Sequence, residues 1–150
     1  MYPSLSTGAI GVKASFQEGL ELAAKHGFSG YHFDIAEVHK LGVEKARDLT
    51  NANNIRLSAW GLPLEFRQNE GRYRKDVLAL PALAKTASEL GVFRTATWIL
   101  SCSDTLTYRQ NFDLHVERLK PVAEILLHHG VRFGLEYVGP KTFWSSKRYT

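Results

Sequence analysis

The stretch Val131-Arg-Phe-Gly-Leu-Glu136-Tyr-Val-Gly139-Pro140 predicts a strand that carries a carboxylate near its end. Its apolar residues alternate with Gly134 and Glu136, so the two sets face opposite sides of a sheet. The apolar set is Val131, Phe133, Leu135 and Tyr137. Gly139-Pro140 cannot continue the ladder and closes the strand. A carboxylate at the carboxyl end of a parallel strand lies where α/β barrels build their sites. For one acidic residue alone, a solvated strand end is the simpler interpretation.

Length and composition indicate a single globular domain over residues 1–150, with ordinary hydrophobic (44%) and charged (23%) contents. No apolar run is long enough to span a membrane and the start lacks the form of a signal peptide, so we expect no membrane partner. Cys102 is the single cysteine, which excludes an internal disulfide and indicates a reducing cytoplasm. The net charge of +4 would suit an anionic partner, but Lys and Arg are interspersed with Glu and Asp, which favours a solvated surface.

Strand and helix signals alternate along the whole chain and predict five strands joined by four helices. We expect strands at 5–7, 30–35, 55–61, 92–100 and 131–137. The helices follow at about 15–27 and 43–52, from close to Pro81 to Leu90, and along an apolar stripe from Phe112 to Leu126. Such alternation predicts a parallel sheet with right-handed crossovers. An open doubly wound sheet and an arc of a barrel both fit, although Gly8 and Gly11 only loosely approximate the phosphate loop of a doubly wound sheet.

Four segments give the chain a resemblance to a known family. They are Gly134-Leu-Glu-Tyr-Val-Gly-Pro-Lys-Thr142, Ala96-Thr-Trp-Ile-Leu100, Arg118-Leu-Lys-Pro-Val-Ala-Glu124 and Phe33-Asp-Ile35. In these four segments the chain resembles the sugar phosphate isomerase/epimerase family of xylose-isomerase-like TIM barrels. The resemblance covers essentially all of the chain, but only the first five of the family's eight β/α units. A complete barrel needs about 250 residues. The implied fold is therefore a partial (β/α)8 barrel, an amino-terminal piece.

The resemblance implies an enzyme that moves a proton next to the carbonyl group of a sugar or sugar phosphate, with help from a metal. Family members hold one divalent ion through a Glu, an Asp, a His and a second Glu from the last four strands, and Glu136 matches the first Glu. Such ligands suit Mn²⁺, Mg²⁺, Co²⁺ or Zn²⁺. Glu136 would also serve as a catalytic acid–base group. The other three ligands would lie beyond Thr150, so we expect the 150-residue chain alone to be inactive.

Further residues are expected to contact the sugar from the strand ends and from the tail. They are Trp98 as an apolar wall, Asp34 as a partner for a hydroxyl group, Trp60 at the mouth and Lys141 for an anionic group. A structural role competes with each of these interpretations, and it is favoured for His32 as an interior histidine and for Arg67 in a surface loop.

Two other functions remain open. Apurinic-site endonucleases share this barrel superfamily, but their multi-metal site needs His or Glu at the ends of strands two to four. The chain has Asp34, Trp60 and Trp98 there, with His32 nearby, so nucleic acid is not the favoured partner; a salt-dependent DNA titration would test this. The second is a truncated half-barrel without activity. Whatever the function, an arc of five strands leaves open edges on its first and fifth strands, and these edges predict self-association of isolated chains.

Overall fold

The computed structural model describes residues 1–67 and 69–138, which form one five-stranded sheet with helices packed against it. The strands are β1 (Ser4–Leu5), β2 (Gly30–Phe33), β3 (Arg56–Gly61), β4 (Arg94–Leu100) and β5 (Arg132–Val138). The helices are the short 3-10 helix η1 (Gly8–Ile10), α1 (Phe16–Lys25), α2 (Ile35–Leu41), α3 (Val43–Asn53), α4 (Glu70–Glu89) and α5 (Tyr108–His128). Within the described residues, no helix combines the length and the apolar character that crossing a membrane requires.

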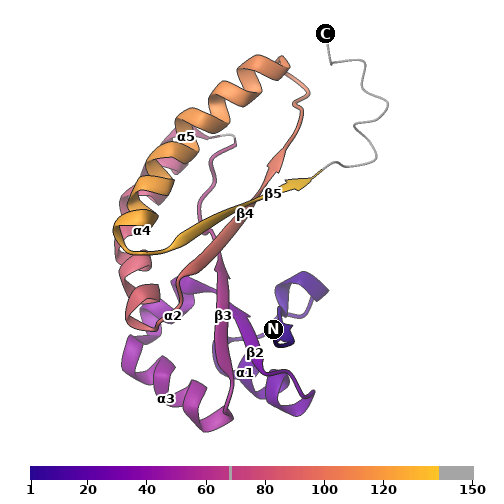
Figure 1. Cartoon of the computed structure of the whole chain (residues 1–150), viewed down its shortest axis with the longest axis vertical. Helices are drawn as coiled ribbons and strands as arrows, with labels where there is room; N and C mark the ends of the chain where they lie inside the picture. The colour runs from indigo at the N-terminus through magenta and orange to yellow at the C-terminus, as the bar shows by residue number, and fades with distance from the viewer. Residues whose placement is uncertain (68, 139–150) are drawn as a thin grey trace.

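The order of the strands settles which architecture the chain adopts. All neighbouring pairs are parallel, and the spatial order β1-β2-β3-β4-β5 is the order along the chain. A doubly wound sheet reverses its order at a switch point, whereas right-handed crossovers that always advance in one direction place the helices on one face. Figure 1 shows α2 to α5 along the same side of the strands. The predicted partial barrel with five parallel strands is therefore confirmed.

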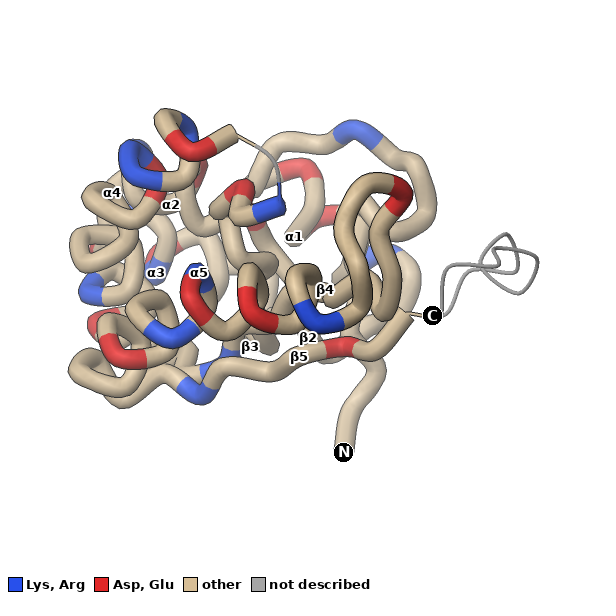
Figure 2. Tube along the Cα trace, turned by 90° about the horizontal axis from the view of Figure 1, so that it is seen from above, with Lys and Arg blue, Asp and Glu red and all other residues tan. Residues whose placement is uncertain are grey.

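The core lies between the sheet and this layer of helices. The largest fully buried side chains are Trp60, Phe16, Phe66, Leu20, Ile35, Leu80, Leu126, Val38 and Val122. They belong to one apolar cluster that includes residues of the strands and of every α-helix. Charged residues lie outside it, and Figure 2 shows Lys and Arg interspersed with Asp and Glu around the helices. One face of the sheet is thereby sealed, and the opposite face stays available for a site.

The prediction of four helices is wrong, because the chain forms a fifth one, α2, directly after β2. The alternation of residues 30–35 was expected to continue the strand to Ile35. Instead the Asp34 side chain begins a helix: its Oδ1 accepts hydrogen bonds from the backbone N–H groups of Ala36 (2.7 Å) and Glu37 (3.1 Å). Such an N-cap satisfies donors that a helix start otherwise leaves unpaired.

The predicted start of the helix that follows β3 is also wrong. This helix, α4, does not start near Pro81 but at Glu70, where Asn69 Oδ1 accepts a hydrogen bond from the backbone N–H of Arg72 (2.9 Å). Pro81 lies inside the helix, where it removes one backbone hydrogen bond. Burial of Leu80 and Ala84 beside it offsets that cost and keeps the helix continuous.

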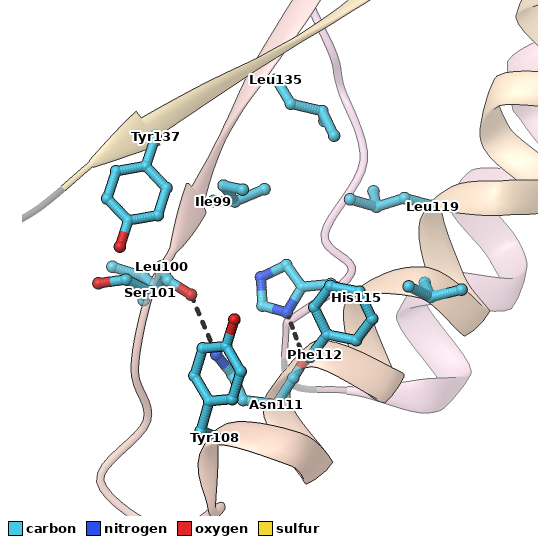
Figure 3. Close-up of a pocket in the computed structure, with 11 residues that line it drawn as sticks. Ile99, Leu100, Ser101, Tyr108, Asn111, Phe112, His115, Leu119, Leu135 and Tyr137 are labelled. Carbon is cyan, nitrogen blue, oxygen red and sulfur yellow. Dashed lines mark hydrogen bonds between the residues drawn. The ribbon is translucent and has the colours of Figure 1, made fainter. Parts of the chain in front are cut away.

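An apolar groove runs between α5 and the carboxyl ends of β4 and β5, with a volume of about 240 Å³. Figure 3 shows Leu135 and Tyr137 of β5 facing Tyr108, Phe112 and Leu119 of α5 across this groove, which we call the α5–β5 groove. Leu135 is 52% exposed and Tyr137 is 72% exposed. Leu135 and Tyr137 thus face the helix layer, and Glu136 between them faces the opposite side of the sheet.

Candidate functional site

The open face of the sheet forms a hollow of about 910 Å³, which lies beside the carboxyl ends of the strands. Its charged and aromatic lining consists of Lys13, Tyr31, His32, Phe33, Asp34, Glu37, Trp98 and Glu136. His32 belongs to β2, Trp98 to β4 and Glu136 to β5, whereas Asp34 and Glu37 follow the end of β2. Parallel barrels place their active sites at this end of the strands. The hollow is therefore the candidate functional site.

Glu136 and Trp98 lie side by side on the open face. They are register partners in the parallel pair β4–β5, two residues before the end of each strand. The preceding partners on this face are Ala96 and Gly134, and a Cβ built on Gly134 would lie 3.4 Å from the Ala96 Cβ. Small residues therefore form the floor beneath the indole and the carboxylate, which leaves room for a ligand above it.

The guanidinium group of Arg67 stacks on the Trp98 ring. Its guanidinium carbon lies 3.9 Å from the centroid of the Trp98 ring and 4.2 Å from that of Phe66, and its Nη2 donates a hydrogen bond to the Trp98 carbonyl. Burial lowers the pKa of Arg67, and the carboxylate of Glu65, 3.8 Å from Nη1, counteracts this effect. Arg67 is therefore not a free surface residue, as the sequence suggested, but a positioning residue for Trp98.

His32 faces the hollow next to Gly61. The His32 Cε1 atom lies 3.7 Å from where a Cβ on Gly61 would stand, so a larger residue at that position would crowd the imidazole. Burial lowers the pKa of His32, while its own backbone hydrogen bond raises it to a smaller extent. The imidazole is thus neutral at neutral pH, with a lone pair available to a hydroxyl group or a metal ion.

The other predicted site residues are placed differently. Asp34 lines the hollow, but its Oδ1 is already engaged as the N-cap of α2. Trp60 is fully buried in the core, on the side of the sheet that faces the helices, so its placement does not support the predicted contact with a sugar. Lys141 lies outside the described residues. Lys13 and Glu37 also line the hollow and were not predicted.

The described residues do not fit a complete metal centre. Across 1–67 and 69–138, no three His, Cys, Asp or Glu side chains come together as a group able to hold a metal ion. Glu136 offers one carboxylate and His32 one imidazole, both on the open face. Water would compete successfully with so few ligands, since structural and catalytic sites use three or more protein groups.

Solved structures with the same fold are barrel proteins. A xylose isomerase domain protein from Alicyclobacillus acidocaldarius subsp. acidocaldarius is 25% identical with a TM-score of 0.80, over 97% of this chain and 53% of that chain. The IolI protein, solved with a zinc atom, is 19% identical with a TM-score of 0.73, over 93% and 52%. D-psicose 3-epimerase from Clostridium cellulolyticum H10, solved with D-tagatose, is 18% identical with a TM-score of 0.65, over 90% and 52%.

The chain spans about half the length of these solved structures. Its sequence matches no protein-family model and no curated protein.

The lowered pKa of His32 predicts how stability depends on pH. Because the unfolded chain, with a His pKa of about 6.5, binds this proton more readily than the folded chain does, the stabilisation from neutral His32 is fully present above that value and is lost as the pH falls through the folded pKa. The free energy of unfolding in urea should therefore fall less in His32→Gln than in the unmodified chain between about pH 7 and about pH 5.

His26→Gln, at the exposed end of α1, is the matched control and should follow the unmodified chain. An NMR titration of His32 with a midpoint at or above about pH 6.5, the ordinary pKa of a His side chain, would contradict the argument.

Proposed function

Because the chain has the fold of a partial xylose-isomerase-like TIM barrel, we propose that its hollow is part of the sugar-binding site of an isomerase or epimerase. The observation that carries this proposal is the pairing of Glu136 with Trp98 at the carboxyl ends of β5 and β4. A carboxylate beside an accessible aromatic ring offers a sugar both a partner for its polar groups and a surface for its C–H groups. Solved structures that resemble this chain include D-psicose 3-epimerase and 3-keto-D-glucoside 4-epimerase, which agrees with this chemistry.

Glu136 would serve as the acid–base group. Its carboxylate would take the proton from the carbon next to the sugar carbonyl; the C–H electron pair would form the double bond of an enediolate, and the carbonyl π pair would move onto its oxygen. Return of the proton to the former carbonyl carbon, with the neighbouring hydroxyl proton passing to the enediolate oxygen, gives an isomer. Return of a proton to the opposite face of the first carbon gives an epimer and needs a second group. A bound Mn²⁺, Mg²⁺, Co²⁺ or Zn²⁺ would lower the cost of the developing negative charge, with Glu136 as one ligand. We assign no step to it, since the described residues do not complete its site.

Trp98 would form the apolar wall of this site. Its side chain is 45% exposed although it is held by Arg67, so an accessible ring surface already stands in place before a ligand binds. A rigid aromatic ring loses little conformational entropy on binding. We propose a small sugar or sugar phosphate as the partner and the cytoplasm as the location, and we favour neither nucleic acid nor a membrane.

Sugar binding should be visible through Trp98. In a Trp144→Phe background, a ketose such as D-fructose or D-tagatose should change the fluorescence of the exposed Trp98, and Trp98→Phe should abolish this response. Trp60→Phe is the matched control, because the buried Trp60 does not line the hollow. Glu136→Gln should weaken binding about tenfold, since a hydrogen bond to a charged group contributes about 1.5–3 kcal/mol.

No fluorescence response to ketoses or ketose phosphates would contradict the proposed function. A response that persists in Trp98→Phe would place the sugar elsewhere on the chain.

We also propose that isolated chains self-associate through the edge of β5. Among the described residues, β5 pairs only with β4, so its other edge presents unpaired backbone groups over seven residues. The α5–β5 groove adjoins this edge and exposes Leu135 and Tyr137. A second copy of the chain is the occupant that we propose, because it would cover the groove and extend the sheet at the same time.

Light scattering should show a mass that rises with protein concentration for the unmodified chain. Leu135→Lys should shift the equilibrium towards the monomer, because a charge in the groove is costly to bury. Leu78→Lys on α4 is the matched control, since Leu78 is 82% exposed and lies outside the groove. A light-scattering mass of the unmodified chain that stays at the monomer value at every concentration tested would rule this proposal out.

A further inference from the structure

Two neighbouring strands begin with an arginine on the open face of the sheet. Arg94 is the first residue of β4 and lies four residues before Trp98, so alternation places both side chains on the same face. Arg132 is the first residue of β5 and the register partner of Arg94, so it faces the same way. The two arginines therefore lie side by side at the amino ends of their strands, whereas the hollow lies at the carboxyl ends.

A third arginine extends this row onto β3. Arg56 is the first residue of β3, and its register partner is Gly30 of β2, two residues before His32. Because His32 faces the hollow, Arg56 also lies on the open face. We call Arg56, Arg94 and Arg132 the arginine row.

A cleft of about 490 Å³ lies beside the arginine row, and we call it the Arg94–Arg132 cleft. Both of these arginines line it together with Tyr2. The guanidinium carbon of Arg56 lies 5.6 Å from the centroid of the Tyr2 ring, at the border of the cleft. The cleft shares no lining residue with the hollow. Arg132 precedes Glu136 by four residues of an extended strand, which separates the two by about 13 Å. A group bound between the arginines is thus separate from a sugar bound at Glu136.

Among the residues that the structure describes, the arginine row has no carboxylate partner. Its three side chains are exposed, and within residues 1–67 and 69–138 they form neither an ion pair nor a side-chain hydrogen bond. Every other described arginine forms an ion pair with Asp or Glu. These paired arginines are Arg47, Arg67, Arg72, Arg74, Arg109 and Arg118. The described part of the chain therefore leaves the positive charge of the row without a counter-charge.

The fold holds these positive charges close together at an energetic cost. Register partners on neighbouring strands have backbones about 4.8 Å apart, and like charges at such positions destabilise a sheet. The carboxyl ends of α4 and α5 reach the same cleft through Gly91 and Gly130 and offset part of this cost. Each helix end contributes only about half a negative charge, against a full positive charge on each arginine. A net positive charge remains in the cleft, and a bound anion would remove the repulsion.

The number and the chemistry of the arginines favour a phosphate group as this anion. A phosphate monoester carries about two negative charges and three acceptor oxygen atoms, so two guanidinium groups can bond to it at once. A carboxylate has one negative charge and two oxygen atoms, and the fork of a single guanidinium already occupies both. A carboxylate would therefore leave one of the paired arginines without a partner.

We propose that the Arg94–Arg132 cleft binds a phosphate group, which accepts hydrogen bonds from the guanidinium groups of Arg94 and Arg132, while Arg56 adds positive charge. The inference goes beyond the proposed function, because it involves neither Glu136 nor Trp98. Inorganic phosphate and a phosphorylated metabolite both present this group. The arginine row thus forms a second binding site, at the opposite end of the open face from the hollow.

The test is an NMR titration of the ¹⁵N-labelled chain with inorganic phosphate at neutral pH, with the ionic strength held constant by sodium chloride. Phosphate should shift the backbone amide signals of Arg94, Gly130 and Arg132 with saturation. Arg132→Gln should weaken phosphate binding about tenfold, because it removes a hydrogen bond between charged groups at an exposed position. Arg109→Gln makes the same change on α5, where the arginine side chain is 84% exposed, and should leave phosphate binding unaltered.

A parallel titration with D-glucose 6-phosphate distinguishes the two sources of the group. Tighter binding of D-glucose 6-phosphate than of inorganic phosphate would support the cleft as a site for a phosphorylated metabolite, and equal or weaker binding would support it as a site for free phosphate.

Two results would overturn the inference. In the unmodified chain, amide shifts that do not saturate with phosphate, or that chloride reproduces, would show that the row only attracts counter-ions from solution. This result holds whether or not the variants fold. Tighter binding of succinate, a dicarboxylate, than of phosphate would assign the row to carboxylate groups, such as those of a protein partner, and not to phosphate.

Discussion

The register between β4 and β5 is the constraint on which the candidate site depends. Because side chains alternate across a strand, a slip of one residue would turn Glu136 towards the helices and bring Leu135 or Tyr137 to the open face. The observed register pairs Glu136 with Trp98 and sets the small pair Ala96 and Gly134 beneath them. Burial of Val131, immediately before β5, gives this register an energetic preference, since the slipped strand would expose it.

The two faces of the sheet have different roles: the face covered by the helices stabilises the fold, and the open face carries the candidate site. Burial of the large apolar side chains on one side supplies the stability, and the other side is left with residues whose polar groups are not consumed by packing. Arg67 shows how the two are linked: it comes from a loop packed under α5 through Phe66, yet it fixes the orientation of an indole on the open face. A buried guanidinium is costly, and its contacts with two rings and with Glu65 offset that cost.

The strands could be predicted from sequence because period-two alternation is a local property, and Glu136 was found in this way. The order of the strands could not, since alternation predicts parallel crossovers but not the direction of each step. A barrel was favoured because the sequence segments around Trp98 and Glu136 resemble those of a TIM-barrel family. The cap made by Asp34 was missed because the alternation of β2 continues through it to Ile35.

Trp60 and Arg67 mark the limit of sequence reasoning. Both alternating sets of β3 contain apolar residues, Leu57 and Ala59 in one and Trp60 in the other, so periodicity does not reveal which set faces the helices. The position of Arg67 depends on a contact with Trp98, 31 residues later, and no local signal encodes it.

The most direct measurement of the central claim is a NOESY spectrum of the chain with assigned Trp98 and Glu136 side chains. The account predicts cross-peaks between the Trp98 indole protons and the Glu136 methylene protons, and none between Glu136 and Phe112 or Leu119 of α5. Cross-peaks from the Glu136 methylene protons to α5, with none to the indole, would contradict it.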